Sequence, residues 1–128
     1  MEVCHTSSPA LILIPDISGF TKYIASCDID HSQDKIALLL ESILENNTLD
    51  FKISEIEGDA ILFYSFDFPY SSMEIIRQCQ LMFDKFHQRI DEFKLSKCMC
   101  GSCQKLYELS LKFVLHFGQL GSVMVKDY

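Results

Sequence analysis

An apolar run that ends in an acidic turn is the feature that most constrains this chain. Residues 10–15 read Ala-Leu-Ile-Leu-Ile-Pro, which is typical of a strand covered on both faces. The run breaks at Asp16, and the Ile-Ser-Gly-Phe-Thr that follows indicates the opening of a helix. A second acidic turn, Glu-Ile-Glu-Gly-Asp over residues 55–59, lies between two further apolar segments. Both turns therefore place carboxylates at the ends of predicted strands.

The position of these acids beside a predicted helix start indicates a site for phosphate and metal. Unpaired amides at a helix N-terminus and the helix dipole both favour an anion. Mg²⁺ is commonly held by one or two carboxylates together with substrate phosphates. The pattern around Asp16 and Asp59 therefore predicts a site for a nucleoside triphosphate and a divalent cation.

Length and composition favour one domain over residues 1–128. The chain has 128 residues, 48% of them hydrophobic, and contains no repeat or long linker. Its 18 acidic and 11 basic residues give a net charge of −7, which argues against nucleic acid or an anionic membrane as a partner. No apolar run approaches the roughly 20 residues of a transmembrane helix, and residues 1–5 lack the layout of a secretory signal. We therefore expect a cytoplasmic protein.

Hydrophobic periodicity predicts an α+β fold. The expected strands are 10–14, 50–56, 60–66 and 109–117, with a short strand at 122–125 after Gly118. The expected helices are 18–26, 32–46 and a long one that begins at the capping-box pair Ser71 and Glu74. The long helix has an apolar stripe of Ile75, Cys79, Met82, Phe83, Phe86, Ile90 and Phe93. The order β-α-α-β-β-α-β is ferredoxin-like, with an antiparallel sheet covered by helices on one face.

Three segments resemble the catalytic domain of class III nucleotidyl cyclases, the family that makes cyclic AMP or cyclic GMP. Residues 13–21, Leu-Ile-Pro-Asp-Ile-Ser-Gly-Phe-Thr, resemble the first metal-binding segment of that family. Residues 58–62, Gly-Asp-Ala-Ile-Leu, resemble its hairpin with the second metal aspartate. Residues 114–118, Val-Leu-His-Phe-Gly, resemble the strand that follows. The motifs occur in the family's order and extend over nearly the whole chain.

The resemblance assigns roles to residues of both acidic turns. It implies that Asp16 and Asp59 hold Mg²⁺ or Mn²⁺ with help from the carbonyl of Ile17. The amides of a loop would bind the phosphates, and this loop comprises Ser18, Gly19, Phe20 and Thr21. One metal would activate the ribose 3′-hydroxyl while pyrophosphate leaves in line. Active sites of this family form between two subunits, so a homodimer is implied. Without the resemblance, Asp16 is explained as a helix N-cap and Asp59 as a turn former.

Glu55 stands four residues before Asp59, where the family places a residue that selects the base. The family uses glutamate there in guanylyl cyclases and lysine in adenylyl cyclases. A carboxylate accepts hydrogen bonds from the ring N–H and exocyclic amine of guanine, and adenine has no such pair of donors at that edge. The resemblance therefore points toward GTP and leaves ATP open. The alternative is that Glu55 is an exposed strand acid without a ligand.

Two features depart from the family pattern. Cyclases continue after the strand of His116 with an Asn and an Arg that stabilise the transition state, and no counterpart is recognisable up to Tyr128. Glu57 also stands where an apolar residue usually precedes the Gly-Asp pair. We therefore expect a shortened, incomplete cyclase-like domain that is inactive in this form. The alternative is a degenerate sensory or interaction module that keeps the fold and has lost catalysis.

A cysteine cluster lies between the long helix and the following strand. Cys98, Cys100 and Cys103 flank Gly101, and three thiolates at this spacing can hold Zn²⁺. The cluster resembles a feature of an uncharacterised bacterial family that is classed with the cyclases. A closed site needs a fourth ligand, and the candidates are His87, Cys79, Cys27, His5 or a residue of another chain. The alternatives are surface thiols or a disulfide between Cys98 and Cys103.

Overall fold

The computed structural model describes residues 5–26, 29–66, 69–94, 105–123 and 125–126. The elements in chain order are β1 (His5–Ser18), α1 (Phe20–Ser26), α2 (Ile29–Glu45), β2 (Lys52–Glu57), β3 (Ala60–Ser65), α3 (Ser72–Lys94), the short 3₁₀ helix η1 (Leu106–Glu108) and β4 (Ser110–Val123). None of the described helices combines the length and apolar character needed to cross a membrane.

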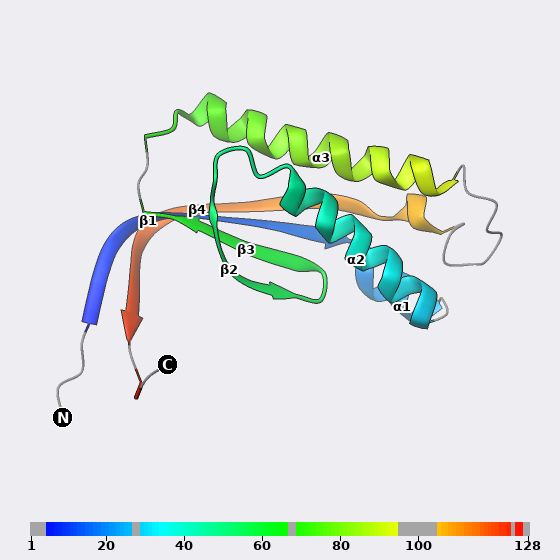
Figure 1. The fold of residues 1–128 in the computed structure, drawn as a ribbon, viewed down its shortest axis with the longest axis horizontal. Coiled ribbons are helices and arrows are strands. Elements are labelled where there is room, and N and C mark those ends of the chain that lie inside the picture. The colour runs from blue at the N-terminus through cyan, green and yellow to red at the C-terminus, as the bar shows by residue number, and fades with distance from the viewer. Residues whose placement is uncertain (1–4, 27–28, 67–68, 95–104, 124, 127–128) are drawn as a thin grey trace.

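The four strands form one antiparallel sheet in the order β2-β3-β1-β4. Figure 1 shows α2 and α3 lying side by side over one face of this sheet, with α1 at the end where β1 stops. This is the predicted α+β, ferredoxin-like architecture with an additional helix after the first strand. The opposite face of the sheet, called the open face below, has no described helix over it.

β1 is longer than the sequence pattern predicted. The prediction ended the strand at residue 14 and made Asp16 the opening of a helix, but β1 continues to Ser18. Asp16 has strand partners on both sides, Ala60 in β3 and Lys112 in β4, and this pairing keeps it in the sheet. Gly19, with a φ of +88°, separates the strand from the helix that begins at Phe20.

β4 is continuous, so the prediction of separate strands at 109–117 and 122–125 was wrong. Its register with β1 runs from Ser110 opposite Ser18 to Val123 opposite His5 without a shift. Gly118 lies inside the strand, where a Cβ atom would stand 2.9 Å from Nε2 of His116. The glycine therefore makes room for the neighbouring imidazole and does not end the strand.

Two helix starts and one strand start also differ from the predictions in detail. α1 begins at Phe20 rather than at residue 18, and α2 begins at Ile29 rather than at residue 32. β2 begins at Lys52 rather than at residue 50, because Asp50 has a left-handed φ of 58°. The predicted cap of α3 is present, since the Glu74 amide donates to the Ser71 hydroxyl at 3.2 Å.

The core lies between the sheet and the helices and contains most of the predicted stripe of α3. Buried members from α3 are Ile75, Met82, Phe86, Ile90 and Phe93, and the sheet contributes Leu11, Leu13, Ile17, Ile61, Phe63 and Leu111. Phe83 was wrongly placed in this core, because its side chain is 39% exposed. It stacks instead on His87, with ring centroids 4.1 Å apart.

Candidate functional site

The two acidic turns meet at one end of the sheet, although they are far apart in the chain. β1 and β3 are neighbours, and their register puts Asp16 opposite Ala60, directly after Asp59. The Ile17 amide donates to the Asp59 carbonyl at 2.8 Å, which ties the two turns together. Gly58 opens the β2–β3 turn with a positive φ of 47°, as a two-residue hairpin turn requires. The pairing of β1 with β3 therefore brings the two aspartates to one place.

The space between the turns is an open cavity of about 350 Å³, called the acidic cavity below. Its walls are Asp16, Ile17, Ser18, Gly19, Phe20, Thr21, Lys22, Asp59 and Lys112. Every residue that the sequence assigned to Mg²⁺ or Mn²⁺ or to the phosphates is in this set, whereas Glu55, which it assigned to the base, is not. The Ile17 side chain is buried in the core, so its part of the wall is main chain.

The two carboxylates repel each other in the absence of a cation. Burial raises the pKa of Asp59, and the negative charge of Asp16 raises it further. A hydrogen bond from protonated Asp59 to Asp16 acts in the same direction, whereas a backbone hydrogen bond and the charge of Lys112 oppose it. The cavity therefore favours a proton or another cation between the two acids.

Lys112 supplies one positive charge at this cavity, and sequence reasoning missed it. Its Nζ lies 3.5 Å from Oδ2 of Asp16, directly across the β1–β4 pairing. The available signal was that Lys112 is the one Lys or Arg in an otherwise uncharged strand. Using that signal requires the register of two strands that lie almost a hundred residues apart in the chain.

The donor set fits a hard divalent cation. Asp16 and Asp59 offer carboxylate oxygens, and Ile17, whose side chain is buried, adds main chain to the cavity wall. Among the described residues no group of three His, Cys, Asp or Glu side chains could hold a metal by itself. The two aspartates would therefore share an ion with water or phosphate oxygens, as Mg²⁺ sites commonly do.

The loop between β1 and α1 is held in a conformation that depends on glycine. Gly19 has a positive φ, and a Cβ atom there would lie 3.2 Å from the Glu108 carbonyl oxygen. The Gly19 carbonyl accepts the Tyr23 amide at 3.0 Å, so Gly19 is the residue that begins the first helical turn. Asp16 lies three residues earlier within β1, so the N-cap explanation for Asp16 is wrong.

Glu55 does not line the acidic cavity, but it lies on the same side of the sheet as Asp16. It pairs with Leu62 in β3, two residues from the Ala60 that stands opposite Asp16. Directly paired residues share a face, and faces alternate along a strand, so Glu55 and Asp16 both point to the open face. Its side chain is exposed there.

The predicted zinc ligands are only partly within the described residues. Cys98, Cys100, Cys103 and Cys27 lie outside them, as does the side chain of His5. Cys79 is half-buried, and burial raises the pKa of its thiol, which disfavours the thiolate that binds metal.

His87, another proposed zinc ligand, has both ring nitrogens in hydrogen bonds. Nδ1 donates to the Phe83 carbonyl at 2.8 Å, and Nε2 accepts the Ser110 hydroxyl at 3.2 Å. Nε2 of His87 could bind a metal only if it lost its hydrogen bond with the Ser110 hydroxyl. The zinc site stays a prediction.

Comparison with solved structures shows that this fold is that of class III cyclases. The adenylyl cyclase CyaB from P. aeruginosa matches with a TM-score of 0.72 and 10% identity, over 96% of this chain and 68% of that one. A class III adenylyl cyclase-like ATP-binding protein from Pseudomonas aeruginosa matches with a TM-score of 0.72 and 19% identity, over 91% of this chain and 26% of that one. The guanylyl cyclase Cya2 matches with a TM-score of 0.60 and 17% identity, over 91% of this chain and 57% of that one.

Comparison of sequences gives the family. The uncharacterized protein Rv2561/Rv2562 of Mycobacterium tuberculosis is 34% identical over 92 residues, which are 71% of this chain. The match spans 42% of the length of that relative. The model of the family described as "Protein of unknown function (DUF2652)" matches residues 36–128, a stretch that includes Asp59 and Lys112. The chain therefore belongs to the DUF2652 family and has the class III cyclase-like fold.

Proposed function

We propose that this domain binds a purine nucleoside triphosphate together with Mg²⁺ or Mn²⁺ in the acidic cavity. The observation that carries the proposal is the convergence of Asp16 and Asp59, with Lys112 beside them, in one open cavity. A divalent cation would relieve the repulsion that raises the pKa of Asp59. The likeness to nucleotide cyclases supports the same ligand class.

The acidic and basic residues of the cavity would bind different parts of the ligand. Asp16, Asp59 and the Ile17 carbonyl would hold the cation, which supplies Lewis-acid stabilisation at the α-phosphate and activation of the ribose 3′-hydroxyl. Lys112 would exchange its contact with Asp16 for one with a phosphate oxygen. The loop of residues 18–21 would surround the phosphates, and Glu55 on the open face is our candidate for base selection.

The site is open on one side, and we propose that a second subunit completes it. The cavity and Glu55 both lie toward the open face, which leaves the base and ribose without a second wall among the described residues. No counterpart of the Asn and Arg expected from the family is recognisable in residues 1–128. We therefore propose cyclic nucleotide formation only for a longer, dimeric form, and nucleotide binding for residues 1–128.

Titration calorimetry with Mn²⁺ and a non-hydrolysable ATP or GTP analogue tests the binding proposal. We expect saturable nucleotide binding that requires Mn²⁺ and is lost in Asp16→Asn. Asp84→Asn is the matched control, because Asp84 is exposed on α3 and lies outside the acidic cavity. Equal nucleotide affinity in wild type and Asp16→Asn would remove the proposal.

The second candidate is a nucleotide-binding module without catalysis. One of the similar structures is described as an adenylyl cyclase-like ATP-binding protein, so the fold also occurs in a protein named for binding alone. Incubation of the longer protein with ATP or GTP and Mn²⁺, followed by chromatography, separates the two candidates. Cyclic product that disappears in Asp59→Asn supports the enzyme, and retained binding without product supports the module.

A further inference from the structure

The edge strand β2 contains a bulge that changes which of its side chains share a face. Lys52 pairs with Tyr64 and Glu55 pairs with Leu62, and the register shifts at Ser54 between them. Leu62 and Tyr64 are two residues apart in β3, so they point to the same face of the sheet. Their partners Lys52 and Glu55 therefore share that face, although residues three apart in a regular strand point to opposite faces.

The face that Lys52 and Glu55 share is the open face. Tyr64 also pairs with Ile12, which is four residues from Asp16 in β1 and points to the same side. Glu55 stands one step of about 7 Å along the sheet from the row of Asp16, and Lys52 stands one step further. Both side chains are exposed. In an unshifted register Lys52 would point to the helix side, so the bulge is what brings a lysine to the open face beside Glu55.

We propose that Lys52 acts with Glu55 to select guanine over adenine, which makes GTP the ligand of this domain. The Glu55 carboxylate would accept from the ring N–H and the exocyclic amine of guanine. O6 of guanine lies next to that ring N–H and is an acceptor, and the ammonium of Lys52 has only donors to offer. Adenine carries an amine where guanine carries O6, so Lys52 would face a donor there. A carboxylate and an ammonium side by side therefore match one purine and oppose the other.

The placement of Lys52 goes beyond what the protection of an edge strand requires. A bulge and charged side chains both discourage an edge strand from pairing with another chain, and a lysine serves that purpose on either face. Within the part of the chain that the structure describes, no ion pair holds the side chain of Lys52 or of Glu55. A donor and an acceptor one step apart on the same face are therefore available to the edge of a flat, polar ligand.

This inference rests on the proposed function and deepens it by naming the base. The proposed function fails if no nucleotide binds together with Mn²⁺. The inference fails on its own if nucleotides bind without a preference that depends on Lys52. Lys52 and Glu55 lie outside the acidic cavity, so substitutions of them leave the metal ligands in place.

Titration calorimetry of the 128-residue chain with Mn²⁺ and GTP, ITP or ATP tests the inference. ITP keeps O6 and the ring N–H of guanine but lacks the exocyclic amine. We expect wild type to bind GTP at least about tenfold more tightly than ATP. Lys52→Met should weaken GTP and ITP by about tenfold and change ATP affinity by less than about twofold, because only the contact with O6 is lost. Lys52→Arg should keep the preference, since a guanidinium also donates to O6. Lys85→Met, exposed on α3, is the matched control and should change none of the three affinities.

The use of ITP separates the two side chains from each other. Glu55→Gln should weaken GTP more than ITP, because the exocyclic amine is present only in GTP, whereas Lys52→Met should weaken both equally. Equal losses of GTP and ATP affinity in Lys52→Met would overturn the inference, because they would assign the lysine to the phosphates. Unchanged GTP affinity in Lys52→Met would also overturn it and leave the bulge as edge protection. A wild type that binds ATP and GTP equally well with Mn²⁺ would remove the inference and keep the proposed function. A chain that binds no nucleotide with Mn²⁺ would remove both.

Discussion

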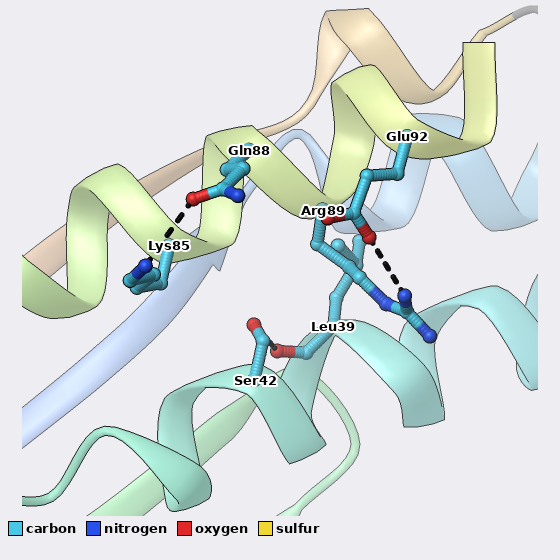
Figure 2. A network of polar contacts seen from close by, with 6 residues as sticks. All are labelled: Leu39, Ser42, Lys85, Gln88, Arg89 and Glu92. Carbon is cyan, nitrogen blue, oxygen red and sulfur yellow. Dashed lines mark hydrogen bonds and ion pairs between the residues drawn. The ribbon is translucent and has the colours of Figure 1, made fainter. Parts of the chain in front are cut away.

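The acidic cavity and the groove between α2 and α3 both collect charged side chains, but they do so in different ways. The groove is the larger, at about 600 Å³, and its walls include Glu41 and Glu45 of α2 and Lys85 and Arg89 of α3. Figure 2 shows three polar contacts beside the groove, each within a single helix: Arg89 donates to Glu92 at 2.8 Å, Lys85 to Gln88 at 3.4 Å, and Ser42 to the Leu39 carbonyl at 2.6 Å. In the acidic cavity, Asp16, Asp59 and Lys112 come from three separate segments.

This difference shows that the size of a cavity and the chemistry of its walls do not go together here. Contacts three residues apart on a helix are ordinary surface pairs of small energy. Two carboxylates that are brought together by strand pairing, with the pKa of one raised, represent a repulsion that the fold tolerates. Such tolerated repulsion is characteristic of functional sites, where a ligand relieves it.

The sharpest test of the comparison is the affinity for Mn²⁺ alone. We expect Asp59→Asn to weaken Mn²⁺ binding by about 100-fold, because it removes a charged ligand. Electron paramagnetic resonance of free Mn²⁺ measures this directly. Glu45→Gln in the groove is the matched control and should leave the affinity unchanged. A loss of equal size in both variants would show that the two regions do not differ.

The loop beside the acidic cavity should be sensitive to a single methyl group. Gly19→Ala forces a non-glycine residue to a φ of +88° and places its Cβ 3.2 Å from the Glu108 carbonyl oxygen. We expect a loss of about 1–2 kcal/mol in the free energy of unfolding, measured with urea. Ala37→Gly on the exposed side of α2 is a comparison within a helix, with an expected loss of about 1 kcal/mol. A neutral Gly19→Ala would mean that the loop relaxes freely.

Lys112 should affect the free metal and the nucleotide complex in opposite directions. In Lys112→Met the contact with Asp16 at 3.5 Å is lost, so Mn²⁺ no longer competes with a lysine. We expect a several-fold tighter binding of Mn²⁺ alone and a several-fold weaker binding of the Mn²⁺–nucleotide complex, on the order of 1 kcal/mol each. Calorimetry on both ligands measures the pair of effects. A change of the same sign for both ligands would contradict the proposed exchange of partners.

The acidic cavity should also give the metal-free protein a characteristic dependence on pH. The pKa of Asp59 is raised in the folded state, so the folded protein binds the proton more tightly than the unfolded chain. Its contribution to stability is present below the unfolded pKa and is lost as the pH rises through the folded pKa. Thermal melts between about pH 4 and about pH 7 should therefore show wild type losing stability relative to Asp59→Asn. Mn²⁺ should reverse this trend at neutral pH.

Much of the fold was predictable because its elements are marked locally. The Gly58-Asp59 turn, the Ser71 cap and the apolar stripe of α3 each follow from short-range chemistry. The full lengths of β1 and β4 were not predictable, because they depend on a register between residues 5–18 and 110–123. Lys112 was missed for the same reason.

The smallest effect on stability is expected from a substitution in the groove, which also tests whether the groove is independent of the acidic cavity. Glu92→Gln removes the acid that accepts from Arg89, but both side chains are well exposed and Arg89 also lies over the Phe93 ring. We expect the free energy of unfolding to change by no more than about 0.5 kcal/mol, since water replaces the lost partner. The affinity for Mn²⁺ should stay constant, because the groove and the acidic cavity share no residue. If Glu92→Gln changed Mn²⁺ affinity, the charges of the groove would have to be coupled to Asp16 and Asp59 through the sheet. The helix surface would then be part of the site, and the contrast between a solvated groove and a strained cavity would fail.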